Sequence, residues 1–228
     1  MIASQDRSGY FGASDVGYII GNWHTATFEK WWLQKIGINR DRFDNRYTSA
    51  GTHYEHRILE SLGIPMELDR QIIIEDLLLR VNLDGNDADT IYECKTFQWI
   101  KGFKLPKKYI QQVQVQMFAS GLRKAKIIVY GLTEDDYDNY FNRIDPERRG
   151  EIIIAYDERW INEVFLPKLK YLAQCLKEGR FPVLKVTGKI VGVTIDFMTN
   201  KPQLVLEVNE RNELKVVVDE LSGKDKLT

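Results

Sequence analysis

Two hydrophobic periods alternate along the chain, and together they predict a mixed α/β protein. Apolar residues at helical spacing, bounded by polar caps and glycines, predict helices over residues 14–20 (with Ser14 as N-cap), 26–36, 48–62, 107–120 and 157–177. Runs rich in β-branched residues predict a hairpin over residues 70–81 and strands over 90–96, 127–132 and 150–156. Pro167 lies inside the last helix and should kink it, because proline lacks an N–H and crowds the preceding turn.

The last part of the chain has a different pattern. Three runs, over residues 183–197, 203–208 and 213–219, are separated by turn residues and predict a β-meander. We therefore expect a main domain over residues 1–182 and a small β-rich appendage over residues 183–228. So short a segment is marginal as a free domain, so it should pack on the main body or else begin a longer module.

Composition narrows the class of protein. Of the 228 residues, 43% are hydrophobic and 29% are charged, which is typical of a globular protein with a substantial core. No apolar run could cross a bilayer, and the first residues lack a secretory signal, so we expect a cytoplasmic protein without a membrane partner. Two cysteines, Cys94 and Cys175, exclude a disulfide framework, a four-thiolate zinc site and an iron–sulfur cluster.

Charge is balanced overall but unevenly distributed. The formal net charge is −1, yet residues 75–93 hold six acidic residues and one basic residue. Residues 101–126, in contrast, hold seven basic residues and no acidic one. A carboxylate cluster followed by a basic segment suits metal ions beside a polyanion. Two solvated faces of opposite charge would produce the same pattern, and charge alone leaves that alternative open.

The chemistry-bearing stretch lies between residues 81 and 96. Asp84 stands where a predicted strand gives way to a glycine turn, and Glu93 and Lys95 share one face of the next strand because strand side chains alternate. Carboxylates suit Mg²⁺, and a nearby lysine could position or deprotonate a water that attacks phosphorus. This spacing alone is weak, since a surface hairpin with a Glu–Lys pair would also show it.

Four motifs in order make the pattern more specific. Residues 11–21 (FGASDVGYIIG), 50–60 (AGTHYEHRILE), 83–96 (containing LDG and ECKT) and 109–121 (YIQQVQVQMFASG) follow one another along the chain. This succession resembles the lambda exonuclease/YqaJ-type viral recombinase family of PD-(D/E)xK nucleases, over roughly residues 7–180. The resemblance implies a restriction-endonuclease-like α/β core, a central mixed β-sheet flanked by helices, to which the C-terminal β-meander would be added.

The resemblance also implies a set of site residues. The expected metal ligands are Glu55, Asp84, Glu93 and the backbone carbonyl of Cys94, with Mg²⁺ as the cofactor and Mn²⁺ as an alternative. The expected catalytic residues are Asp84, Glu93, Lys95 and Gln112. The expected contacts to DNA or its 5′-phosphate are Arg7, Ser14, Lys101, Tyr109 and Gln114. The chain departs from the family pattern at Leu83, where a proline is usual, and at Asn82, where lambda exonuclease has a serine.

Some of these positions have alternatives that the sequence leaves open. Glu55 could simply pair with Arg57, and His53 or His56 on the same helix could contact a metal. The glutamines of residues 111–116 could form a solvated polar stripe; Gln112 and Gln116 share a helical face with Tyr109, and we favour Gln112 over Gln114 as a functional residue.

The activity implied by the resemblance is that of a metal-dependent deoxyribonuclease. It would degrade linear duplex DNA from its ends, 5′→3′, and leave 3′ single strands for phage-type recombination beside a single-strand annealing protein. Relatives form trimeric rings, so a homo-oligomer in the cytoplasm of a bacterial host is expected. A structure-specific or restriction-type endonuclease on the same core, or an inactive DNA-end-binding module, are the alternatives.

Overall fold

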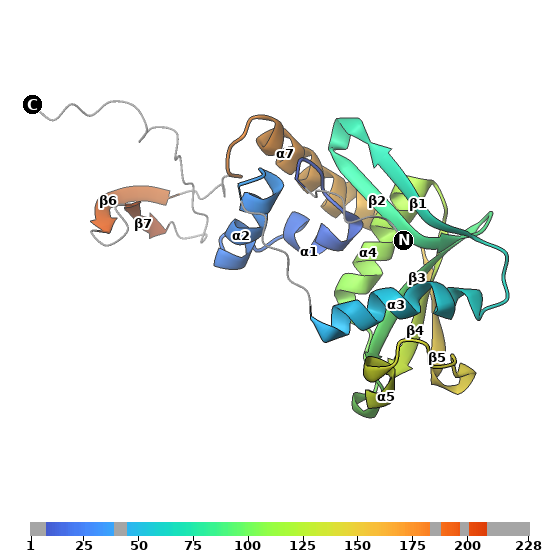
Figure 1. Ribbon diagram of the computed structural model, residues 1–228. Helices are drawn as coiled ribbons and strands as arrows, with labels where there is room; N and C mark the ends of the chain where they lie inside the picture. Colours follow the sequence, from blue (N-terminus) through green and yellow to red (C-terminus); the bar gives the residue numbers. More distant parts are fainter. Residues whose placement is uncertain (1–7, 39–44, 183–187, 197–200, 209–228) are drawn as a thin grey trace, which may run out of the picture. The chain divides into compact units, whose positions relative to one another are not determined.

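The computed structural model describes residues 8–38, 45–182, 188–196 and 201–208 (Figure 1). The chain divides into two compact units, Met1–Gly179 and Arg180–Thr228. In the second unit, strands β6 (Gly188–Asp196) and β7 (Lys201–Val208) form an antiparallel hairpin. The third predicted run of the meander, residues 213–219, lies outside the described residues, as does Arg7.

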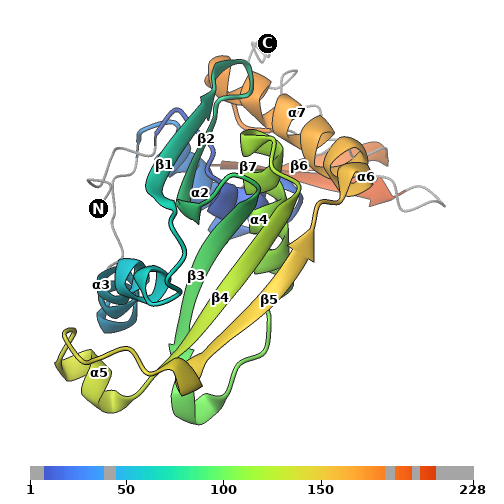
Figure 2. The ribbon, with the colours of Figure 1, turned by 90° about the vertical axis from the view of Figure 1, so that its right-hand side faces the viewer.

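A five-stranded mixed sheet forms the centre of the first unit. Its strands, in spatial order, are β1 (Glu67–Ile74), β2 (Leu79–Asn86), β3 (Thr90–Gln98), β4 (Lys124–Leu132) and β5 (Arg149–Ala155). Strands β3 and β4 are parallel and all other neighbours are antiparallel; β3, β4 and β5 lie side by side in Figure 2. Helix α4 (Lys107–Ser120) makes the crossover that parallel pairing requires. The predicted mixed sheet is therefore confirmed.

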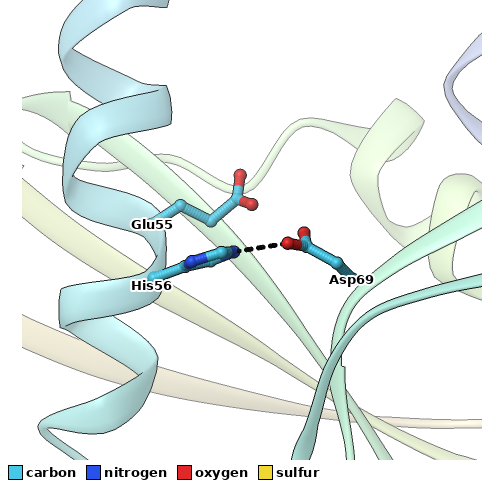
Figure 3. Close-up of side chains that lie close together, drawn as sticks. All are labelled: Glu55, His56 and Asp69. Atoms are coloured by element: carbon cyan, nitrogen blue, oxygen red, sulfur yellow. Dashed lines mark ion pairs between the residues drawn. The ribbon is translucent and has the colours of Figure 1, made fainter. Parts of the chain in front are cut away.

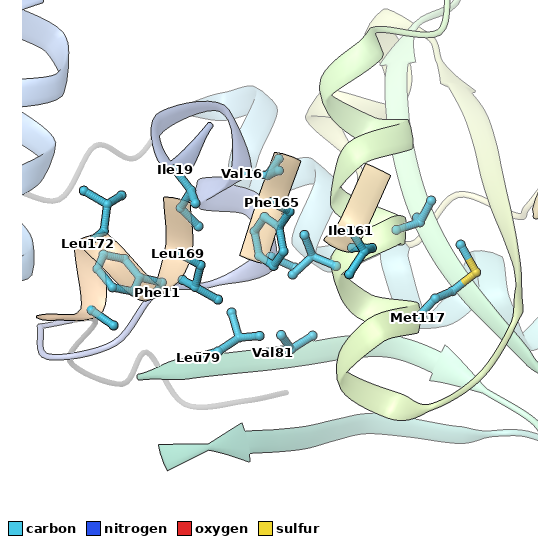
Figure 4. Close-up of a cluster of buried hydrophobic side chains, with 14 of the residues drawn as sticks. Phe11, Val16, Ile19, Leu79, Val81, Met117, Ile161, Phe165, Leu169 and Leu172 are labelled. Atoms are coloured by element: carbon cyan, nitrogen blue, oxygen red, sulfur yellow. The ribbon is translucent and has the colours of Figure 1, made fainter. Parts of the chain in front are cut away.

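Helices cover both faces of the sheet because the strands alternate between two apolar cores. On β4, Ile127 and Val129 belong to one buried cluster, whereas Ile128 and Tyr130 belong to another. The first cluster collects side chains from α1 (Val16–Ile19), α2 (Ala26–Lys35), α4 and α7 (Leu166–Lys177) (Figure 4). The second collects side chains from α3 (Arg46–Glu60) and α5 (Glu134–Asp138). No helix of the described residues is long and apolar enough to cross a membrane.

Shorter elements join these layers. The 3₁₀ turns span Ala13–Asp15, Glu75–Leu77, Trp99–Lys101 and Pro146–Arg148. The first of them corrects a sequence expectation: Gly12, rather than Ser14, is the N-cap, and the Asp15 carboxylate accepts a hydrogen bond from the Gly12 N–H at 2.7 Å. Asp15 is buried and also pairs with Lys35 at 2.6 Å, so this turn is tied to α2.

The predicted long C-terminal helix is interrupted where its proline lies. Asp157 caps α6 (Glu158–Trp160), which widens into a π-helical turn over Ile161–Phe165 before α7 continues. Pro167 cannot donate a hydrogen bond to the preceding turn, and the wider turn directly before α7 accommodates that missing donor. The structure thus places a wide turn just before Pro167, the residue at which the sequence predicts a kink.

A buried aspartate on α5 forms an ion pair with the Pro146–Arg148 turn and accepts a hydrogen bond from α3. Asp136 is 1% exposed, pairs with Arg148, and accepts hydrogen bonds from the Thr133 N–H at 2.8 Å and the Tyr54 hydroxyl at 3.2 Å. Replacing Arg148 by methionine should lower the free energy of unfolding by about 3 kcal/mol, because it leaves a buried carboxylate without its cation. Urea denaturation measures this change in the free energy of unfolding. Arg159→Met, which removes an exposed pair with Glu163, is the control and should change stability little; equal losses would contradict the prediction.

Candidate metal-dependent nuclease site

The candidate site begins where strands β2 and β3 separate. Their pairing stops at Gly85 and Tyr92, so the backbone groups beyond that point need other partners. The Cys94 N–H donates to the Asp84 carboxylate at 2.8 Å, and the Asn82 carbonyl accepts from the Gln116 side chain at 3.3 Å. The side chains of Asp84, a predicted metal ligand, and Gln116 thus replace the sheet hydrogen bonds at this point.

Glu93 is the centre of the cluster. Its side chain is 1% exposed and lies on the same face of β3 as Lys95, as strand alternation predicts. One carboxylate oxygen, Oε1, accepts from Lys95 Nζ and from Gln112 Nε2, the latter at 2.5 Å. The other oxygen, Oε2, accepts from Gln116 Nε2. The structure therefore brings Glu93, Lys95 and Gln112 together, and it adds Gln116.

Lys95 is held as an ammonium ion by the neighbouring carboxylates. Burial alone would lower its pKa, but the charges of Glu93 and Asp84 outweigh burial and raise the pKa above its usual value. The amine also lies 5.1 Å from the centre of the Tyr109 ring, so Tyr109 is part of its surroundings. An ammonium group suits the positioning of water and the neutralisation of phosphate charge better than it suits the removal of a proton.

The other two predicted carboxylates, Asp84 and Glu55, have raised pKa values. Burial raises the pKa of Asp84 well above its usual value, and repulsion from Glu93 and Glu55 raises it further. Burial and repulsion from Glu93 likewise raise the pKa of Glu55. Three carboxylates with one ammonium beside them, two of the carboxylates with a raised pKa, form a donor set that fits a divalent cation such as Mg²⁺.

A second grouping shares Glu55. Among the residues that the structure describes, the three-residue group whose ligand atoms all lie within 4.8 Å of one another is Glu55, His56 and Asp69 (Figure 3). His56 Nε2 lies 3.1 Å from Asp69 Oδ2. Among the described residues, Glu55, Asp84 and Glu93 do not approach one another as closely, and Glu93 is held by Lys95 and the two glutamines.

The two histidines of α3 differ in their surroundings. His53 Nδ1 bonds to the Ser49 carbonyl oxygen at 2.7 Å, and its ring stacks on Tyr140, whereas His56 faces Asp69. Asp69 was not predicted from the sequence. Its backbone is left-handed (φ 59°) within β1, a conformation that is uncommon for a non-glycine residue and that no spacing pattern reveals.

Other predicted residues lie apart from the Glu93 cluster or outside the described chain. Gln114 Nε2 donates to the Ala155 carbonyl and its Oε1 accepts from the Asp157 N–H, both at 2.7 Å. Its amide therefore joins α4 to the β5–α6 connection, and its expected contact to DNA stays a prediction. Ser14 is exposed on the Ala13–Asp15 turn, and Lys101 is exposed at the end of the turn that follows β3.

Cys94 and Gln116 are two further buried residues at the site, one predicted from the sequence and one not. The Cys94 thiol is buried, and burial raises its pKa, so only its backbone carbonyl suits the predicted ligand role. Gln116 was not among the predicted site residues, although its spacing of four from Gln112 placed both on one face of α4. That spacing was the signal that could have identified it.

Comparison with known proteins gives the fold. No family model matches the chain, and no curated protein is significantly similar to it in sequence. A solved structure of LHK-Exo in complex with dAMP has a TM-score of 0.59 and 19% identity, covering 76% of this chain and 90% of that one. A second structure of LHK-Exo, an alkaline exonuclease from Laribacter hongkongensis, has a TM-score of 0.54 and 21% identity. It covers 76% of this chain and 94% of that one.

A third solved structure belongs to a different organism. It is a phage-related exonuclease from Haemophilus somnus 129PT, with a TM-score of 0.57 and 17% identity, covering 75% of this chain and 94% of that one. The matched share is comparable to the first unit of this chain, which holds the mixed sheet and the Glu93 cluster. The chain therefore has the α/β fold of these alkaline and phage-related exonucleases.

Proposed function

We propose that the chain is a metal-dependent DNA exonuclease that hydrolyses phosphodiester bonds of linear duplex DNA. The observation that carries the proposal is the buried Glu93 carboxylate, bonded to the Lys95 ammonium and to Gln112 and charge-coupled to Asp84 and Glu55. Such a set of groups has no evident value for stability, because its carboxylates repel one another. It suits the binding of a cation and of a charged phosphodiester.

Each residue has a role in this proposal. Glu55, Asp84, Glu93 and the Cys94 carbonyl would hold Mg²⁺ or Mn²⁺, which supplies Lewis-acid stabilisation of negative charge on the phosphoryl group. Lys95 neutralises charge at the scissile phosphate and, with Gln112, orients the attacking water. The centre of the Tyr109 ring lies 5.1 Å from the Lys95 amine, and Tyr109 would contact the DNA beside it. Gln114, expected at the DNA, has its amide bonded to Ala155 and Asp157 and is given no role at the metal.

The basic segment after β3 suits the duplex backbone. Lys101, Lys104, Lys107 and Lys108 are all exposed, and no acidic residue interrupts them in sequence. Exposed lysines contribute sequence-independent affinity by displacing counterions from phosphates. With Ser14 and Arg7 proposed at the 5′-phosphate, these residues would bind DNA ends without reading sequence.

The proposed direction, product, protein partner and oligomeric state come from the resemblance in sequence motifs. They are digestion in the 5′→3′ direction, release of 3′ single strands for phage-type recombination, cooperation with a single-strand annealing protein, and assembly into a homotrimer. Of the similar folds, one belongs to a phage-related exonuclease and another was solved with dAMP bound, which agrees with the coarser proposal of a DNA exonuclease. The nuclease domain would span residues 1–182 and the protein would act in the host cytoplasm.

The test uses duplex DNA of defined ends. Linear 5′-phosphorylated duplex, labelled at either terminus, should lose its 5′-labelled nucleotides first in the presence of Mg²⁺ and remain intact with EDTA. Covalently closed circular duplex, the matched control, should remain intact in both conditions. Cleavage of the closed circle would favour the endonuclease alternative, and binding of ends without degradation in Mg²⁺ or Mn²⁺ would favour the inactive binding module.

A further inference from the structure

Gln116 donates a hydrogen bond to the central carboxylate, Glu93, although it is not one of the proposed metal ligands. It lies on α4, is 1% exposed, and donates through Nε2 to Glu93 Oε2. The same Nε2 lies 3.3 Å from the Asn82 carbonyl oxygen. Gln112, one helical turn earlier, holds the other oxygen of Glu93. Two amides of one helix therefore hold the two oxygens of one buried carboxylate.

The orientation of the Gln116 amide is dictated by its neighbours. Its oxygen, Oε1, is buried and has no hydrogen-bond partner among the described residues. Turning the amide over would put Oε1 against Glu93 Oε2 and the Asn82 carbonyl, which are both acceptors. The amide thus leaves its own acceptor unsatisfied in order to give Glu93 a donor. A residue selected only for stability would be better satisfied, because buried polar groups are rarely left without a partner.

Gln116 also connects two strands at the point where they separate. Asn82 lies on β2, two residues before Asp84, and Glu93 lies on β3 beyond the last paired residues. No backbone hydrogen bond of the sheet pairs β2 with β3 at this level, so the single Nε2 of Gln116 links the strand that carries Asp84 to the side chain of Glu93.

We propose that Gln116 is a positioning residue that orients the Glu93 carboxylate and ties it to strand β2, which carries Asp84, so that both carboxylates serve one divalent cation. The inference rests on the proposed metal-dependent function and deepens it, because it assigns the metal affinity partly to a residue that is not itself a ligand. Groups that orient metal ligands commonly account for tenfold or more of metal affinity.

Direct measurement of Mn²⁺ binding tests the inference without relying on activity. Gln116→Met keeps the length of the side chain and removes the donor, and it should weaken Mn²⁺ binding about tenfold, measured by the electron paramagnetic resonance signal of free Mn²⁺. Gln114→Met is the matched control: it is a buried amide on the same helix with two partners, neither of them Glu93. Its Mn²⁺ affinity should stay within about twofold of the unchanged protein, although its stability falls.

A second pair of variants covers the case in which methionine prevents folding. Gln116→Asn keeps an amide but shortens it by one methylene, so the donor no longer reaches Glu93, and Gln114→Asn is its control. Thermal unfolding without metal shows which variants are folded. Unchanged Mn²⁺ affinity in a folded Gln116 variant would overturn the inference alone. An unchanged protein that binds no Mn²⁺ would overturn the proposed function and this inference together.

Discussion

Replacing Lys95 by alanine is expected to slow the degradation of linear duplex DNA by about 10³-fold while leaving DNA binding nearly intact. The reason is electrostatic. Glu93 and Asp84 hold the Lys95 amine in its charged form, beside the place where negative charge would develop on the phosphate. The lost interaction matters most in the transition state, so the loss should appear in the rate rather than in affinity. Single-turnover degradation and gel-shift titration measure the two quantities separately.

Mn²⁺ binding distinguishes this role from that of a structural lysine. Removing the Lys95 ammonium should leave Mn²⁺ affinity the same or higher, because its positive charge beside Glu93 repels a bound divalent cation, which the neutral Gln116 amide does not. Lys170→Ala, on an exposed position of α7, is the control and should degrade DNA at the normal rate. A Lys95→Ala protein with a normal rate would remove Lys95 from the mechanism.

Replacing Asp84 by asparagine should have two opposite consequences. It should slow metal-dependent degradation by about 10³-fold, since a neutral amide is a poor ligand for Mg²⁺. It should also raise the thermal midpoint of the metal-free protein by about 3 °C or more, because it removes a carboxylate that burial, Glu93 and Glu55 all disfavour. Asparagine keeps the size of the side chain and can still accept the Cys94 N–H, so packing should not change.

The pH dependence of stability has a definite sign. The pKa of Asp84 is raised in the folded chain, so folding binds a proton that the unfolded chain releases near its ordinary pKa of about 3.9. The stability associated with the protonated Asp84 is complete below that pH and is lost as the pH rises through the folded pKa. The gain from Asp84→Asn should therefore be small in acid and grow toward neutral pH.

Differential scanning calorimetry in EDTA at several pH values measures this effect. Glu60→Gln, which neutralises an exposed carboxylate of α3, is the control and should show little gain at any pH. Addition of Mg²⁺ should stabilise the unchanged protein more than the Asp84 variant, because only the former offers the full set of carboxylates. A variant no more stable than the unchanged protein at neutral pH would contradict the proposed repulsion.

Several features of the fold and site were determined locally and could be predicted from the sequence. The hairpin of β1 and β2 follows from apolar runs around Glu75, and the strand β3 places Glu93 and Lys95 on one face because side chains alternate. The capped helices α3 and α4 follow from apolar residues at helical spacing. Each of these features depends on residues close together in the chain, so a linear pattern contains enough information.

Tertiary structure alone decided which polar groups distant in sequence bond to one another. Gln114 and Gln116 lie two residues apart on α4, so their side chains point to opposite sides of the helix, and one bonds to β5 and the other to Glu93. The spacing separates the two sides, but only the rotation of α4 against the sheet decides which side meets Glu93. Asp69 comes beside His56 through the path of β1, and Gly12 takes the cap expected of Ser14. The amino-acid pattern determined which elements form and which face of each is polar. Packing between elements determined which polar groups meet, because hydrogen bonds across the core depend on geometry that local spacing does not encode.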